Sequence, residues 1–144
     1  MTYTIYDPAT GQILELFSTS DGVVSSLVLA NSTYIQGAYD PNMYYVEQGQ
    51  AVLKSTRPLN NYGAYNFDYA TKTWQLDQAQ LNSMMRQQRD QLLAQVDRMN
   101  PIWYASLSVD QQQQLQTYRQ ALLDVPQQTN FPTSVEWPAK PHWL

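Results

Sequence analysis

Residues 76–81 read Leu76-Asp77-Gln78-Ala79-Gln80-Leu81 and mark a change of pattern within the 144-residue chain. Asp77 is typical of a helix N-cap, and Gln80 stands where the second side chain of a capping box reaches back to the cap. Leu76 and Leu81 flank this cap as a hydrophobic staple. The stretch therefore predicts a helix that begins at Gln78, after a part of the chain that lacks helical periodicity.

Beyond Asp77, apolar side chains recur at three- and four-residue steps, the period of one helix face. This first helix is predicted to run from about residue 78 to 99, because Pro101 pushes Asn100 out of helical backbone angles. A second capping box, at Ser108 and Gln111, opens another helix that ends at Pro126. The result is a predicted helical hairpin with a loop at 101–107. Its core stripe comprises Leu81, Met85, Gln88, Leu92, Val96 and Met99, then Leu115, Tyr118, Leu122 and Val125.

Before residue 77, short segments rich in Tyr, Val, Ile and Thr alternate with turn residues, which predicts an antiparallel, meander-like sheet. Three turns place an aspartate after an aromatic residue, at Asp7, Asp40 and Asp68. An aspartate bonds the backbone two residues on, so a recurring turn explains these positions better than a true repeat. The stretch 23–30 fits a buried strand or a short helix. The predicted strands are 2–6, 13–18, 34–39, 44–47, 51–55 and 64–68.

The composition disfavours several classes of partner and of functional site. Charged residues make up only 14% of the chain, and the net charge of −4 disfavours nucleic acid and membrane surfaces as partners. The chain has no cysteine and a single histidine, His142, so neither a disulfide nor a multi-histidine metal site is expected. No cofactor is predicted. The N-terminus lacks the pattern of a signal peptide, and we expect the protein in the cytoplasm.

The remaining catalytic option is a pair of carboxylates, Asp90 and Asp97, on one helix. Two helical turns separate them by about 10 Å, which is wide even for an inverting glycosidase. An ion pair between Arg86 and Asp90, four residues apart, explains the first carboxylate without chemistry. The protein is therefore predicted not to be an enzyme.

The chain is predicted to form three parts: an antiparallel β domain at 1–76, the hairpin at 77–127, and an extended, proline-rich arm at 128–144. Large rings on the arm, Phe131, Trp137 and Trp143, are held by a backbone that proline stiffens. They either pack on the chain's own helices or insert into a partner. Because stiffening lowers the entropy lost on docking, we favour insertion into a partner.

The C-terminal block resembles the bacteriophage tail assembly chaperone family, which includes tail-fibre assembly proteins. The resemblance rests on 88–93 (Gln-Arg-Asp-Gln-Leu-Leu) with Asp97, on 118–126 (Tyr-Arg-Gln-Ala-Leu-Leu-Asp-Val-Pro), and on Phe131-Pro132, Val135, Trp137-Pro138 and Pro141. The family often has Trp at the position of Leu115 and Arg at that of Leu123. The two leucines make this helix face more aliphatic and less basic in the present chain. The N-terminal part looks like the variable sheet domain that often precedes this block.

The resemblance implies a non-enzymatic assembly factor with an α+β fold. It would bind a phage tail or tail-fibre structural protein in the bacterial host cytoplasm, and self-association remains open. The alternative is a permanent minor subunit of the virion tail, baseplate or fibre attachment. The candidate partner-binding residues come from the hairpin loop, the family block and the arm: Trp103, Tyr104, Tyr118, Arg119, Phe131, Trp137 and Trp143.

Overall fold

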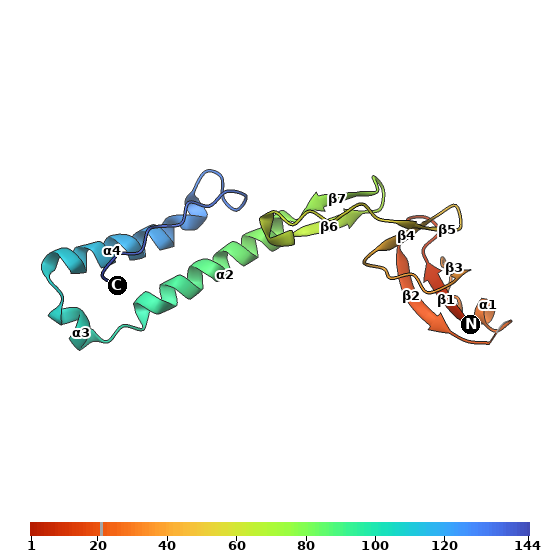
Figure 1. Cartoon of the computed structure of the whole chain (residues 1–144), viewed down its shortest axis with the longest axis horizontal. Helices are drawn as coiled ribbons and strands as arrows, with labels where there is room; N and C mark the ends of the chain where they lie inside the picture. Colours follow the sequence, from red (N-terminus) through yellow and green to blue (C-terminus); the bar gives the residue numbers. More distant parts are fainter. Residues whose placement is uncertain (21) are drawn as a thin grey trace. The chain divides into compact units, whose positions relative to one another are not determined.

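A computed structural model describes residues 1–20 and 22–144. They divide into two compact units (Figure 1). The first, here called the β unit, comprises Met1–Pro58 and Tyr65–Gln75, and the second, the helical unit, comprises Leu59–Ala64 and Leu76–Leu144. Antiparallel strands come first and most of the helix follows, so the predicted α+β class is confirmed.

The largest sheet of the β unit has three strands in the order β2-β1-β3. β1 (Thr2–Tyr6) lies in the centre and pairs antiparallel with β2 (Ile13–Ser18) and with β3 (Thr33–Gln36). The central position explains why Tyr3, Thr4 and Ile5 are all buried. The ambiguous stretch 23–30 contains a short helix, α1 (Val24–Leu27).

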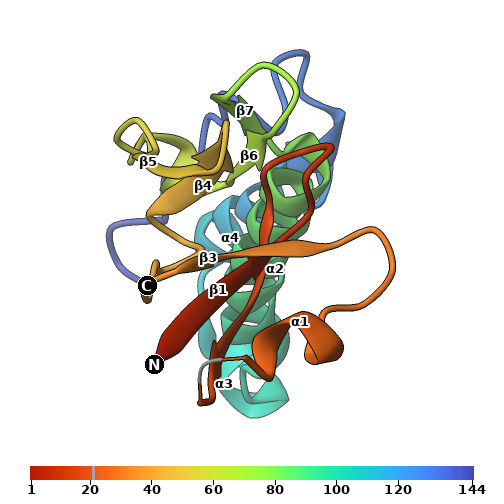
Figure 2. The same cartoon turned by 90° about the vertical axis from the view of Figure 1, so that its right-hand side faces the viewer.

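Two separate hairpins complete the β unit, so the prediction of one meandering sheet is wrong (Figure 2). They are β4 (Tyr44–Glu47) with β5 (Gln50–Leu53), and β6 (Tyr65–Asp68) with β7 (Thr73–Leu76), which was not predicted. Each pair of four-residue strands, joined by a local turn, forms its backbone hydrogen bonds within its own hairpin. The second partner of β1 is β3 and not a strand of either hairpin. The strand predicted at 34–39 stops at Gln36, because Gly37 adopts a φ of 121°.

The three aspartate turns are built as predicted. Each carboxylate accepts a hydrogen bond from the backbone N–H two residues on, from Ala9 to Asp7 at 2.8 Å, from Asn42 to Asp40 at 2.8 Å and from Ala70 to Asp68 at 2.9 Å. At Asp68 this bond is the main cause of a lowered pKa. The same local solution therefore closes three turns of the β unit.

Lysines on aromatic rings connect these small sheets. The Lys54 ammonium lies 4.7 Å from the centre of the Phe67 ring and 5.0 Å from that of Tyr69, and donates to the backbone carbonyl of Pro41 at 2.7 Å. Lys72 lies 4.8 Å from the centre of the Tyr45 ring and donates to the Thr10 carbonyl at 2.7 Å. Both cations thus bond backbone of one segment and the rings of another, which compensates for the missing ladder between sheets.

Replacement of Lys54 by Met is expected to destabilise the β unit by about 1–3 kcal/mol, because it removes the cation–ring contacts and charged hydrogen bonds but keeps the apolar stem. The loss is measurable by urea unfolding followed through the indole N–H NMR signal of Trp74, which donates to the Ser55 carbonyl at 2.8 Å. Lys140→Met, on the exposed arm, is the matched control and should leave this signal's midpoint unchanged. Equal midpoints for both variants would contradict the role of Lys54.

The helical unit is a hairpin of α2 (Gln78–Asp97) and α4 (Val109–Asp124), which lie side by side (Figure 1). Asp77 caps α2 by accepting from the Gln80 N–H at 2.9 Å, and its own N–H donates to the Ala64 carbonyl at 2.8 Å. Ser108 and Gln111 form the predicted capping box of α4. Both predicted helix starts are therefore confirmed.

The predicted loop at 101–107 is wrong, since it contains a further helix, α3 (Pro101–Ser106). Asn100 caps it by accepting from the Ile102 N–H at 2.8 Å, and Pro101 occupies the first turn, where its missing N–H costs nothing. The proline that ends α2 thus also begins α3. Two short 3-10 helices, η1 (Asn61–Gly63) and η2 (Val125–Gln127), complete the helical unit.

Two apolar clusters form the core of the helical unit, and the predicted stripe supplies all of their buried residues except Ala64. The first, cluster 1, gathers Val96, Leu115, Tyr118 and Leu122, with Leu92, Met99 and Tyr104 packed against it. The second, cluster 2, gathers Ala64, Leu81 and Met85. Ala64 comes from the segment Leu59–Ala64, which explains why these residues belong to the helical unit.

The C-terminal arm packs on these clusters of its own chain. Phe131 and Val135 contact cluster 2, Trp143 and Leu144 contact cluster 1, and Trp137 contacts both. In the single chain the arm therefore docks in cis, and its insertion into a partner stays a prediction. The physical reason is that both helix stripes leave apolar surface uncovered, and the arm follows α4 directly, so covering it costs little chain entropy.

The arm is also closed on itself by one side chain. The Gln128 amide donates to the Glu136 carbonyl at 2.8 Å and accepts from the Glu136 N–H at 2.9 Å. This pair of bonds, here called the Gln128 clasp, closes residues 128–136 into a loop. The loop carries Phe131 and Val135 onto cluster 2.

Candidate functional site

Four of the seven predicted partner-binding residues lie at the α3 end of the hairpin, here called the tip. The rings of Trp103 and Trp143 have centroids 6.4 Å apart. The Trp143 indole N–H donates to the side-chain carbonyl of Gln114 at 2.6 Å, which fixes the end of the arm beside α4. Tyr104 and Arg119 line one cleft at this end.

The tip cleft has a volume of about 330 Å³ and is lined by both apolar and polar side chains. Among the polar ones, the Gln116 amide donates to the Tyr104 hydroxyl at 2.8 Å. Arg119 Nε donates to Asp97 Oδ1 at 2.8 Å, and this carboxylate raises the pKa of Arg119 above its ordinary value. The cleft is lined by Val96, Asp97, Met99, Pro101, Tyr104, Leu115, Gln116 and Arg119.

Large apolar side chains stand exposed around the tip. Ile102 of α3 is 81% exposed, Val109 at the start of α4 is 80% exposed, and Trp103 is 38% exposed. The tip cleft adds the amide of Gln116 and the Arg119–Asp97 ion pair, and Asp110 follows Val109, so the surface carries little net charge. Such a combination of aromatic, aliphatic and amide groups suits a neutral protein contact, in which a few large side chains carry most of the binding energy.

The other three predicted residues pack within the helical unit in the single chain. Tyr118 is buried in cluster 1, and burial raises the pKa of its phenol. Phe131 and Trp137 are half-buried on the clusters of the same chain. The structure therefore brings Trp103, Tyr104, Arg119 and Trp143 together at the tip and places these three in the packing between helices and arm.

The buried phenol of Tyr118 predicts a loss of stability in alkali. Its neutral form is favoured in the folded state, so this contribution is fully present below the ordinary pKa near 10 and is lost as pH rises through the raised value. Tyr118→Phe removes the ionisable group, so the urea midpoint of the variant should fall less than that of the parent between pH 9 and pH 11. Parallel decreases in the two proteins would contradict this expectation.

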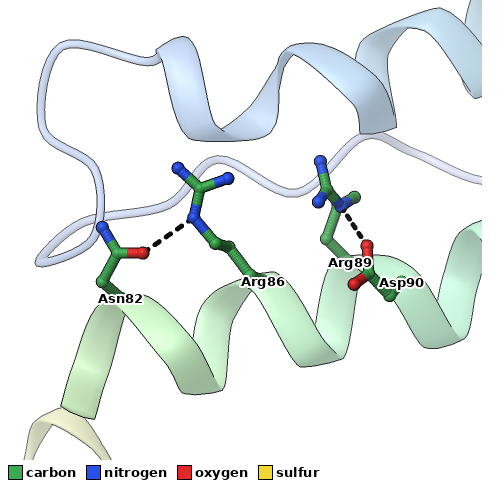
Figure 3. Close-up of polar contacts among 4 residues, drawn as sticks. All are labelled: Asn82, Arg86, Arg89 and Asp90. Atoms are coloured by element: carbon green, nitrogen blue, oxygen red, sulfur yellow. Dashed lines mark hydrogen bonds and ion pairs between the residues drawn. The ribbon is translucent and has the colours of Figure 1, made fainter. Parts of the chain in front are cut away.

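The two carboxylates considered for catalysis are both ion-paired. Asp97 binds Arg119, and Asp90 accepts from the adjacent Arg89 Nε at 2.6 Å (Figure 3). The predicted Arg86–Asp90 pair is wrong, because Arg86 Nε instead donates to Asn82 Oδ1 at 2.8 Å. Across residues 1–20 and 22–144, no group of three or more His, Cys, Asp or Glu side chains is placed to hold a metal ion.

Sequence reasoning missed the polar side chains that position the arm. A groove of about 820 Å³ lies between α4 and residues 138–142, and Gln113 and Gln114 line its α4 side. The glutamine run at 111–114 was the available signal, but it did not say which amide meets Trp143. The Gln128 clasp joins residues eight positions apart in a non-helical segment, for which no sequence pattern exists.

Residues 82–142 match the family model described as phage tail assembly chaperone protein. No curated protein and no solved structure matches the chain. None of the helices described here is both long and apolar enough to cross a lipid bilayer. The match spans most of α2, all of α3 and α4, and the arm to His142, and it confirms that this C-terminal block resembles the phage tail assembly chaperone family.

Proposed function

We propose that this chain is a non-enzymatic phage tail assembly chaperone that binds a tail or tail-fibre structural protein through the tip of its helical hairpin. The observation that carries the proposal is the extent of the family match, residues 82–142, which falls inside one compact unit. The matched residues thus include both helices, the covering arm and the exposed tip. Its place of action would be the host cell during assembly.

The mechanism is the covering of apolar surface on an unassembled partner. Unpaired strand edges and apolar patches make free structural subunits prone to aggregate. A protein that binds only the folded subunit stabilises it by mass action. The exposed Ile102, Trp103 and Val109 supply apolar contact area, and Gln116 and Tyr104 of the tip cleft supply neutral hydrogen-bonding groups. Low charge on this surface agrees with a contact that does not depend on electrostatic steering.

The experiment is co-purification of the tagged chain from host cells that express the tail genes of the same phage. The double variant Ile102→Ser with Trp103→Ser should lose the tail protein while its melting temperature stays within a few degrees of the parent. The matched control is Leu59→Ser, since Leu59 is 87% exposed and belongs to the same helical unit. Retained binding by the double variant, or equal loss by the control, would contradict the tip as the binding surface.

The permanent virion subunit remains the second candidate. It uses the same surfaces, so binding assays do not separate the two roles. Mass spectrometry of purified virions does: a chaperone is absent from them, and a permanent subunit is present at stoichiometric copy number. The arm is covered by its own helices, so its ordered conformation does not favour the permanent subunit.

A further inference from the structure

Two arginines rise from the same face of α2, away from the tip described above. They are Arg86 and Arg89, one helical turn apart (Figure 3). Residues three apart on a helix are surface neighbours, with about 5–6 Å between their Cβ atoms. An open depression of about 580 Å³ runs along α2 beside Arg86; Ser83, Arg86, Gln87, Asp90, Gln91 and Ala94 line it, and Arg89 does not.

Each of the two guanidinium groups is held in place by a hydrogen bond that its own Nε donates. Arg86 Nε donates to Asn82 Oδ1 at 2.8 Å, and Arg89 Nε donates to Asp90 Oδ1 at 2.6 Å. Arg86 Cζ also lies over the Phe131 ring, 5.6 Å from its centre, in a cation–ring contact. The orientation of each group is therefore set while its two terminal nitrogens stay available.

These terminal nitrogens have no protein acceptor among the described residues. Figure 3 shows both guanidinium groups extending from α2 toward α4 and the arm, with their Nε bonds to Asn82 and Asp90. The Arg89 side chain is only 15% exposed, so its charge lies in a partly dehydrated place where hydrogen bonds to an anion are stronger than in bulk water. Two oriented forks with free donors are the arrangement that carboxylates and phosphates bind in a bidentate manner.

We infer that Arg86 and Arg89 form a binding site for a carboxylate, contributed by an aspartate or glutamate of the bound tail protein. The identity of that partner rests on the proposed function, but the site itself does not. Its anchoring by Asn82, Asp90 and Phe131 means that little side-chain entropy is lost when the ligand binds.

Charge balance favours a carboxylate over a phosphate. Arg86, Arg89 and the paired Asp90 together carry one net positive charge, which a single carboxylate neutralises. A phosphate dianion would leave excess negative charge beside Asp90, on a chain whose net charge is already −4. The site therefore fits an acidic side chain on a protein better than a nucleic acid backbone.

The test is an NMR titration of the full chain, with the arginine Nε–H signals as the readout. The probes are a blocked tetraglutamate peptide, a blocked tetraglutamine peptide and inorganic phosphate, at matched ionic strength. We expect tetraglutamate to shift the Arg86 and Arg89 signals in a saturable way and tetraglutamine to leave them unchanged. Absence of a saturable shift overturns the site, and an equal response to phosphate overturns the assignment to a carboxylate.

Variants distinguish bidentate hydrogen bonding by the guanidinium groups from the effect of positive charge alone. Arg86→Lys with Arg89→Lys keeps both charges but removes the bidentate geometry, and we expect at least ten-fold weaker binding of tetraglutamate, read from the remaining signals of α2. Undiminished binding by this variant overturns the forked site. Arg98→Lys, at the exposed end of α2, is the matched control and should bind as the parent does. The Trp143 indole signal, fixed by its bond to Gln114, reports whether the arm stays docked.

Failure of this titration is distinguishable from failure of the proposed function. The titration uses the isolated chain and a synthetic peptide, whereas the proposed function is tested by co-purification of a tail protein through the tip. A normal titration with no co-purified tail protein would leave the carboxylate site standing and remove its assigned partner. Co-purification with no response to tetraglutamate would do the reverse.

Discussion

Leu122→Ala is expected to lower the free energy of unfolding of the helical unit by about 3–5 kcal/mol, the upper part of the range for a buried leucine. The Leu122 side chain is completely buried at the centre of cluster 1, between α2 and the arm. Its removal leaves a cavity that these elements cannot close without separating from α4. Because domains are marginally stable, a loss of this size removes a large part of the total.

The measurement is urea unfolding followed by circular dichroism at 222 nm, which reports mainly on α2, α3 and α4. Leu59→Ala is the matched control, with the same atoms deleted from an exposed leucine, and should change the stability by less than about 0.5 kcal/mol. If the two variants unfold at the same urea concentration, the proposed core of the hairpin is wrong.

Truncation after Gln128 is expected to destabilise the helical unit by about 4 kcal/mol or more, because it uncovers apolar surface on both clusters. The removed residues include Phe131, Trp137 and Trp143, which pack on the helices in cis. Trp137→Ala alone should cost about 2–4 kcal/mol, since this ring contacts both clusters at once. His142→Ala, on the exposed face of the arm, is the control and should leave the melting temperature unchanged.

Partner binding by the same truncated protein separates the two ways in which an arm can act. With the arm docked in cis, the melting temperature falls first, and any loss of the tail protein follows from unfolding. Binding is therefore measured well below the melting temperature of the truncated chain. Lost binding at an unchanged melting temperature would instead show that the arm works by insertion into the partner.

The helical unit was largely predictable because its signals are local. The caps at Asp77 and Ser108 and the apolar period from Leu81 to Val125 are each read within a few residues, and the structure confirms them. The helix α3 was missed because Asn100 and Pro101 follow the end of α2 and also begin α3. Only the second of these roles needs the cap bond to Ile102, which the sequence does not display.

The β unit was less predictable because its connections are made between distant residues. The aspartate turns are local and were recognised, and strand β1 was found with its bounds. The pairing of β1 with β3, and the contact of Lys54 with Phe67, depend on three-dimensional packing that no short pattern encodes. The candidate site was predictable to the same extent. Its aromatic residues were recognised from the sequence, but the residues that hydrogen-bond to them, such as Gln114, were not.

The Gln128 clasp imposes an unequal tolerance to mutation on its two ends. At position 128 the side chain must donate and accept at once and must reach across the loop, so Glu lacks the donor and Asn lacks the length. At position 136 only backbone atoms take part, so every residue that keeps its N–H satisfies the clasp, and proline does not. A saturation scan should therefore show one restricted position and one permissive position, although both belong to the same pair of bonds.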